Sequence, residues 1–317
     1  MASSNGALIA RSPVAPSLSV VVVAYDMERE LPRTLRTLTP HYQRGVEAGD
    51  YEVIVVDNGS PKPVDDVPDA SSGIFRTIRL DPAPPSPARA ANVGLQIAEG
   101  AIIGLIIDGA RMASPGLLHH AMLATKLAAR PVISTLGWHL GSVRHMDVAD
   151  SHDQAAEDRL LGEVDWARDG YRLFEVATLA ASSHRGWFAP MGESSALFMT
   201  KECWEELGGL DEGFALPGGG LVNHDLYRRA CELEGSQLIV LVGEGTFHQF
   251  HGGAATSRQV TWDTMQQDYA AIRGQPYQPP PTTAMYLGTA PPPTWPHLEY
   301  SARFAIERRQ RLQANQV

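Results

Sequence analysis

The sequence predicts an α/β fold in which a mainly parallel sheet is covered by helices on both faces. Strand-like and helix-like segments alternate over residues 18–130, which is the pattern of βαβ units. The strand-like segments are continuous apolar runs, as expected for strands that are buried on both faces. Polar residues follow several of these runs, and ligands bind beyond the carboxyl ends of the strands in such sheets.

Four strands are expected in the first half, each a short run of apolar residues: 18–24, 51–56, 74–80 and 101–108. Helices are expected at 27–38, 86–98 and 115–129. In the first helix, Leu31, Leu35 and Leu38 recur at helical spacing and make an amphipathic stripe. Ser86 is the expected cap of the second helix, with Pro87 in its first turn.

The second half of the chain is less regular. Its expected elements are strands at 131–141 and 237–243, a strand followed by a helix within 194–214, and a helix at 223–235. Gly208 is expected to close the first of these helices, and Asn223 to cap the second. The charged stretch from about 147 to 170 is expected to be mostly helical or a mobile loop.

Composition excludes several classes of function. The 317 residues are 44% hydrophobic and carry a net charge of −10, which argues against a general affinity for nucleic acid or anionic membranes. No apolar run is long enough to span a membrane, and the amino terminus lacks a signal pattern, so we expect a cytoplasmic protein. Cys203 and Cys231 have neither disulfide nor zinc spacing and are expected to be free thiols.

The first predicted strand is not followed by a phosphate-binding glycine motif. The segment "VVVAYDMERE" has no GxGxxG, and the chain has no GxxxxGK[ST], so neither a dinucleotide fold nor a P-loop is indicated. Five other segments appear in a familiar order: "SVVVVAYDMERELPRTLRTL", "YEVIVVDNGS", "ARAANVGLQIAEGAIIGLIID", "GGLDEGF" and "NHDLYRRA". In this order they resemble the family 2 glycosyltransferases, over roughly residues 18–252. The resemblance implies a GT-A type, Rossmann-like fold and a UDP-sugar or related nucleotide-sugar donor.

With this resemblance, the chain divides into four expected parts. They are a disordered lead at 1–17, a nucleotide-sugar-binding half at 18–130, an acceptor-binding and catalytic half of the same domain at 131–274, and a Pro-rich arm with a C-terminal helix at 275–317. The helix is expected near 299–313. The arm either folds on its own chain or joins two copies as a homodimer.

The resemblance assigns the nucleotide to the carboxyl ends of the early strands. Asp57 would accept from the uracil N3–H, although Asp-Asn-Gly-Ser is also good turn sequence. Arg89 and Asn92 would approach the ribose or the diphosphate, where a guanidinium suits phosphate oxygens. The full set implied for the nucleotide is Ala24, Tyr25, Asp26, Asp57, Asn58, Arg89, Asn92, Asp108 and Arg111.

The metal site is where the sequence departs from the family. The family presents Asp-x-Asp for Mn²⁺ or Mg²⁺, but this chain has Asp108 followed by glycine and alanine, so the second carboxylate is missing. Two replacements are available. His248 or His251, just after a late strand, could complete a metal site with Asp108. Arg111 could instead place a fixed positive charge near the phosphates.

For catalysis, the resemblance implies an inverting transfer in which Asp225 is the general base. A carboxylate in the first turn of a helix tends to stay ionised, which suits a base. The residues implied for the acceptor, whose identity the sequence does not give, are Glu193, Asp211, Glu212, His224 and Trp187.

Two other functions stay open. A retaining GT-A enzyme could share the late histidine, and it would differ in the stereochemistry of its product. A catalytically silent GT-A domain would bind a nucleotide or serve as a scaffold, and it would show no turnover. A nucleotidyltransferase is not indicated, because the glycine-rich, lysine-bearing loop that it needs is missing after the first strand.

Overall fold

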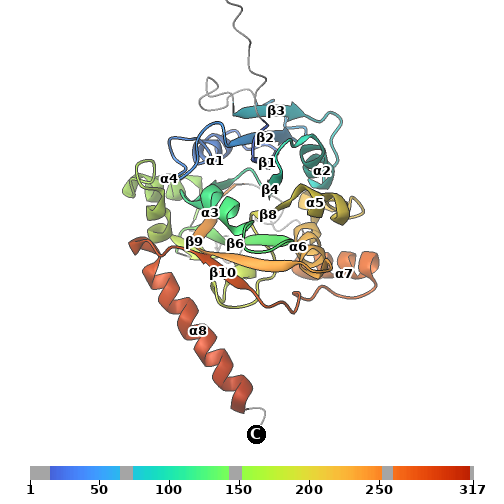
Figure 1. Cartoon of the computed structure of the whole chain (residues 1–317). Coiled ribbons are helices and arrows are strands. Elements are labelled where there is room, and N and C mark those ends of the chain that lie inside the picture. The colour runs from blue at the N-terminus through green and yellow to red at the C-terminus, as the bar shows by residue number, and fades with distance from the viewer. Residues whose placement is uncertain (1–14, 65–73, 143–151, 252–259, 315–317) are drawn as a thin grey trace, which may run out of the picture.

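The computed structural model describes residues 15–64, 74–142, 152–251 and 260–314. The predicted α/β fold is confirmed: one sheet runs in the order β10-β9-β6-β8-β4-β1-β2-β3, with β5 paired to β9 and β7 to β6 (Figure 1). Most of the expected lead at 1–17 and the first part of the charged stretch near 147 lie outside the described residues.

The strands are short except for two long ones in the second half. Their bounds are β1 Leu18–Ala24, β2 Tyr51–Asp57, β3 Phe75–Arg79, β4 Ile102–Ile106, β5 Arg111–Ala113, β6 Pro131–Leu140, β7 Ala177–Leu179, β8 Leu197–Thr200, β9 Gln237–His248 and β10 Met285–Gly288. The pairs within β4-β1-β2-β3 and within β6-β9-β10 are parallel, whereas β8 runs antiparallel to both β4 and β6. The sheet is therefore mainly parallel, as the sequence predicts.

The α-helices connect the strands and cover both faces of the sheet. They are α1 Leu31–Arg36, α2 Ala88–Ile97, α3 Leu117–Ala124, α4 Gln154–Glu163, α5 Lys201–Leu207, α6 Val222–Glu232, α7 Trp262–Arg273 and α8 Trp295–Ala314. Alternate residues of β1 and β2 enter two separate cores, since side chains of a strand alternate between faces. Val21 and Val23 lie in the core with α2, α5 and α6, while Val20 and Val22 lie in the core with α1 and α3.

Three local features differ from the sequence predictions. The helix α6 begins at Val222, and Asn223 does not cap it but lies in its first turn, where its amide is used for other contacts. The last long strand does not stop at 243 but continues to His248, so this histidine is part of the sheet. In α2, Pro87 is the N-cap residue, and the Ala88 N–H reaches the Ser86 hydroxyl at 3.3 Å.

The Pro-rich arm contributes to the sheet. Within it, β10 adds a parallel edge strand beside β9, and α8 follows. This helix begins four residues before the expected 299 and projects away from the body of the molecule (Figure 1). Among the helices of the described residues, none combines the length and the apolar character that a bilayer crossing requires.

The register of the sheet brings the predicted site residues to one edge. Ala24 at the end of β1 is opposite Asp57 at the end of β2. On its other side, Val22 is opposite Ile106, and Asp108 lies two residues beyond. Parallel strands thus gather Tyr25, Asp57 and Asp108 beyond their carboxyl ends.

Candidate functional site

The ends of β1 and β2 form a polar turn beside an exposed aromatic ring. The Asn58 N–H donates to the Ala24 carbonyl oxygen at 2.8 Å. The residue that follows β1, Tyr25, is 54% exposed. Asp26 has a φ of 52°, a region that aspartate enters more readily than most residues, and its N–H donates to the Ser60 hydroxyl at 3.0 Å. This arrangement offers a flat base one open ring face and several polar groups.

Asp57 is fully buried and is held by a residue that sequence reasoning missed. The Ser60 N–H donates to Oδ1 of Asp57 at 2.8 Å, and Nη1 of Arg79 donates to Oδ2 at 2.6 Å. Arg79 also donates to the Ser60 carbonyl oxygen at 2.8 Å. Arg79 lies opposite Asp57 in the parallel pair of β2 and β3, so the predicted order of parallel strands could have identified it. Each carboxylate oxygen has two lone pairs, so Asp57 keeps acceptor capacity, and a ligand reaches it only when the residues that cover it move.

Arg89 and Asn92, the two residues of α2 predicted to approach the ribose or the diphosphate, have different surroundings. Arg89 is exposed. The Asn92 side chain instead anchors the loop after α5: its Nδ2 donates to the Leu210 carbonyl oxygen at 3.0 Å and to Glu212 at 2.9 Å, and its Oδ1 accepts from the Leu210 N–H at 2.8 Å. The contacts of Asn92 therefore join the nucleotide half to the expected acceptor residue Glu212.

The predicted metal ligands come together. His248 Nε2 lies 2.9 Å from Asp108 Oδ2, His251 Nε2 lies 3.8 Å from Asp108 Oδ1, and the two Nε2 atoms are 3.1 Å apart. One ligand atom from each residue falls within 4.8 Å of the others. One carboxylate and two imidazoles are an acceptable ligand set for Mn²⁺, so the residues present fit the metal that the family resemblance implies.

The protonation states of Asp108 and His248 suit a metal, whereas the hydrogen bond and charge of Asp108 outweigh burial and raise the pKa of the His251 imidazole, which favours its protonated form. Burial raises the pKa of Asp108, but hydrogen bonds and charge from His248 and His251 outweigh it and hold that pKa well below its usual range. Burial lowers the pKa of the His248 imidazole. An ionised carboxylate and a neutral imidazole are the forms that bind a cation.

Arg111 places a positive charge next to this cluster. It is opposite His248 in the β5-β9 pair, and its Nε lies 3.7 Å from Asp108 Oδ2. Its Nε and Nη1 atoms are buried, and within the described ranges they have no hydrogen-bond partner. A buried guanidinium with unused donors is costly unless a ligand satisfies it, which makes Arg111 a candidate for phosphate oxygens.

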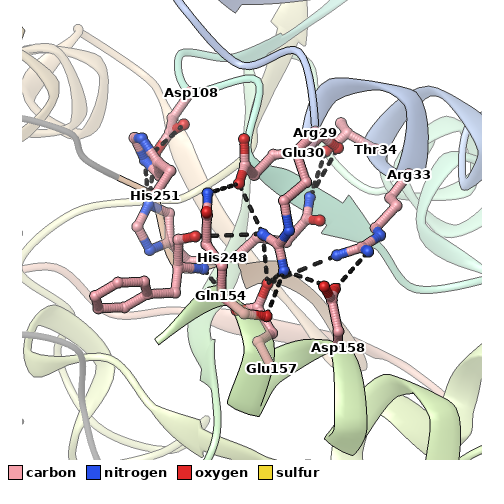
Figure 2. Close-up of polar contacts among 12 residues, drawn as sticks. Arg29, Glu30, Arg33, Thr34, Asp108, Gln154, Glu157, Asp158, His248 and His251 are labelled. Atoms are coloured by element: carbon pink, nitrogen blue, oxygen red, sulfur yellow. Dashed lines mark hydrogen bonds and ion pairs between the residues drawn. The ribbon is translucent and has the colours of Figure 1, made fainter. Parts of the chain in front are cut away.

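A charged network borders the cluster of Asp108, His248 and His251 on the side of α1 and α4 (Figure 2). Arg29, which follows the end of β1, contacts Glu30 at 2.7 Å, Asp158 at 2.7 Å and the buried Glu157 at 3.3 Å. Arg33 also contacts Asp158, at 2.6 Å. Sequence reasoning missed this network, because its members are ordinary surface-type residues until α4 folds against α1.

Two of the expected acceptor residues lie together. Nδ1 of His224 is 3.5 Å from Oε2 of Glu193, and the Asn223 amide donates to the same oxygen at 2.7 Å. Burial raises the pKa of Glu193, but the charges of His224 and Arg111 and the hydrogen bond from Asn223 hold it below its usual value. Glu193 is therefore an ionised carboxylate within the electrostatic reach of Arg111.

Asp225 lies in a different environment. Its carboxylate is fully buried and accepts from Arg229 Nε at 2.7 Å and from Arg273 Nε and Nη2 at 2.6 and 2.8 Å. Arg273 also contacts Asp211 at 2.8 Å. Both oxygens of Asp225 are thus occupied by arginines, an arrangement that neutralises a carboxylate and joins α6 to α7.

Trp187 corrects one expectation. It is 0% exposed, and its ring contacts Trp138 and Phe174 with centroids 5.7 and 6.2 Å apart. An indole enclosed in this aromatic core has no open face for a sugar. The prediction of Trp187 as an acceptor-binding residue is therefore wrong in this fold, because the residue packs inside the second half of the domain.

The fold is similar to that of known proteins. TarS from S. aureus has a similar structure over 81% of this chain, with 12% identity and a TM-score of 0.51. The structure of TarS residues 1–349 in complex with UDP-GlcNAc matches 83% of this chain and 68% of that one, with 14% identity and a TM-score of 0.49. The chain spans 42% of the length of the first of these structures. No curated protein matches the sequence.

At such low identity, the first of these structures supports the fold alone. The sequence itself carries the family assignment, because residues 19–108 match the family model described as Glycosyl transferase family 2. This range begins in β1 and ends at Asp108, so it contains the strand ends described above. The resemblance seen in the motifs is confirmed over residues 19–108, which match this family's model.

Proposed function

We propose that the chain is a metal-assisted glycosyltransferase that moves a sugar from a UDP-sugar to an acceptor hydroxyl with inversion. The observation that carries the proposal is the meeting of Asp108, His248 and His251 at the carboxyl edge of the sheet. Tyr25 and Asp57 lie at the ends of the adjacent strands. A nucleoside bound at those two residues has its diphosphate directed along the same edge toward the three ligands.

Asp108, His248 and His251 would hold Mn²⁺ or Mg²⁺. When bound, the ion would neutralise charge on the leaving diphosphate. Imidazole ligands favour Mn²⁺, since Mg²⁺ prefers oxygen ligands. The guanidinium of Arg111 would donate to the phosphate oxygens from the neighbouring strand, which gives its buried donors a partner.

The choice of uridine rests on Tyr25 and Asp57. A pyrimidine can stack on the exposed ring of Tyr25, and its N3–H can donate to Asp57. Arg79 orients the Asp57 carboxylate through its short contact of 2.6 Å. Arg89, exposed on α2, remains a proposed contact for the ribose or the diphosphate.

The transfer also needs a group that accepts the proton of the attacking hydroxyl. Asp225 stays the prediction from sequence, but the two arginines on its carboxylate speak against a free basic oxygen. Glu193 is the second candidate, because it is ionised, close to His224 and under the influence of Arg111. The acceptor, a homodimer through the arm and a cytoplasmic location stay expectations from sequence.

Donor cleavage is the test of this function. The purified chain would be incubated with UDP-glucose, UDP-galactose and UDP-GlcNAc in Mn²⁺, and release of UDP would be measured against an Asp108→Asn variant. We expect release by the native chain and at least a tenfold slower release by the variant. If UDP binds but no donor is cleaved, a silent domain replaces the enzyme. If the anomeric configuration is kept in the product, the retaining alternative replaces inversion.

A further inference from the structure

His251, one of the three metal ligands, is not part of a strand. The strand β9 ends at His248, and residues 249–251 leave the sheet toward α1 and α4. The direction of the His251 imidazole therefore depends on the contacts of the two residues between the histidines. Those two residues are Gln249 and Phe250.

Gln249 attaches the segment to the sheet and to α1. Its N–H donates to the Ala110 carbonyl oxygen at 2.8 Å. Its side-chain amide donates to the Glu30 carbonyl oxygen at 3.0 Å and to the Thr34 hydroxyl at 3.2 Å. These contacts fix the start of the segment but leave the two peptide groups on either side of Phe250 to other partners.

Glu157 supplies one of those partners. It lies on α4, its side chain is 0% exposed, and its Oε2 accepts from the Phe250 N–H at 2.6 Å. Arg29 contacts Glu157 Oε1 at 3.3 Å and reaches the Phe250 carbonyl oxygen at 3.4 Å (Figure 2). The carboxylate and the guanidinium thus hold both the N–H and the carbonyl of the residue that precedes the metal ligand.

The contacts of Glu157 differ from those of its neighbour on α4. Asp158 has a side chain that is 49% exposed and contacts only Arg29 and Arg33 among the described residues. Glu157 instead buries its whole carboxyl group, which accepts from a main-chain N–H in addition to its contacts with Arg29 and Arg33 and is costly to bury without these partners. The peptide that Glu157 fixes is Gln249–Phe250, and Arg29 reaches the carbonyl of the following peptide, Phe250–His251.

We propose that Glu157 is a positioning residue for the metal site. Through the Phe250 peptide it holds His251 so that its imidazole faces Asp108, and Arg29 holds Glu157 in turn. Outer partners of metal ligands typically change metal affinity by about 10–100-fold when they are lost. This inference rests on the proposed function, because it takes the Asp108, His248 and His251 cluster as a metal site.

The test is a titration of Mn²⁺ alone into the apo protein, followed by calorimetry. The variants are Glu157→Met, which keeps the volume and loses the acceptor, and Glu157→Gln, which keeps an oxygen for the Phe250 N–H. We expect Glu157→Met to lose about 10–100-fold in Mn²⁺ affinity and Glu157→Gln to stay within about threefold of the native chain. Asp158→Asn is the matched control on the same helix and should bind Mn²⁺ as the native chain does.

Three results would overturn the proposal. Native-like Mn²⁺ affinity in a folded Glu157→Met variant would reduce Glu157 to a structural residue. An equal loss in Asp158→Asn would mean that any damage to α4 weakens the site. If Glu157→Met does not fold, Mn²⁺ affinity is compared in Glu157→Gln and in Arg29→Met instead. Arg29→Met removes the group that holds Glu157. A native chain that binds no Mn²⁺ would reject the metal site itself, and the positioning role with it.

Discussion

His248 Nε2 lies 2.9 Å from Asp108 Oδ2, although one residue ends the last long strand and the other follows the fourth strand. The pairing of β5 with β9 brings them together, because Arg111 and His248 are opposite each other in that pair. The single aspartate that follows β4 therefore finds its partner not in a second carboxylate but in the two histidines. This relationship is the basis of the predictions that follow.

Arg79 should matter for nucleotide affinity, because it is the ion-pair partner of Asp57. We expect Arg79→Met to weaken UDP binding by about tenfold, since it removes a charge-assisted hydrogen bond of roughly 1.5–3 kcal/mol that orients the carboxylate. Arg76→Met is the matched control: it lies on the same strand but contacts Glu52 and the Ile97 carbonyl oxygen. Calorimetry measures the UDP affinity of both variants. An equal loss of affinity in the two would mean that Asp57 does not bind the base.

Arg111 should act on the diphosphate and not on the nucleoside. Its buried Nε and Nη1 donors lack a hydrogen-bond partner among the residues with described positions, so a phosphate would satisfy them. We expect Arg111→Met to lower affinity for UDP by about tenfold while affinity for uridine stays unchanged. A uridine affinity that falls as much as that of UDP would mean that the substitution disturbs the whole edge of the sheet.

Glu157 should make stability depend on pH. Burial raises its pKa to about 7, although the Phe250 N–H, Arg29 and Arg33 oppose that rise. The folded chain therefore holds this proton to a higher pH than the unfolded chain, whose carboxyl titrates near the ordinary 4.5. The free energy of unfolding that this group contributes falls as pH rises from about 4.5 to about 7. Above pH 7 the loss is complete and stays constant.

Glu157→Gln removes this titration. Denaturant unfolding between pH 5 and pH 8 should give the variant a stability that rises relative to the native chain with increasing pH. Asp158→Asn is the control, since the pKa of Asp158 is lowered and its titration lies below that window. If the free energy of unfolding varies with pH in the same way in the native chain and in Glu157→Gln, Glu157 does not cause the pH dependence.

Asp225 and Glu193 should separate stability from catalysis. Asp225→Asn leaves the charges of Arg229 and Arg273 uncompensated, which should cost about 2–3 kcal/mol because both guanidinium groups keep partial access to water. Glu193→Gln should preserve UDP affinity and lower the rate of donor cleavage by about 100-fold. Rates are compared below the unfolding temperature of each variant. The reverse pattern, with a fast Glu193→Gln and a slow but stable Asp225→Asn, returns the role of base to Asp225.

The sequence predicts the first half of the fold better than the second for a physical reason. Buried parallel strands such as 18–24 and 51–56 are continuous apolar runs, and residues such as Asp57 and Asp108 that follow them are readily recognised. The histidines were also identified in advance, from their place just after a predicted late strand.

Other parts of the site depend on packing between distant segments, which local patterns do not encode. Arg29 and Glu157 become a network only when α4 packs on α1. The sequence around Trp187 allows both a sugar-binding surface and a core residue. Its contacts with Trp138 and Phe174 place it in the core. Asp225 has the helix position of a base, but Arg273, from a helix far along the chain, occupies its carboxylate.

The most direct measurement is a calorimetric titration of UDP into the native chain, once with Mn²⁺ and once with EDTA. The account predicts UDP binding that is at least tenfold tighter with Mn²⁺, and a loss of that difference in His251→Ala. Equal UDP affinity in Mn²⁺ and in EDTA would contradict the metal role of Asp108, His248 and His251. Arg111 would then be the group that neutralises the phosphate charge.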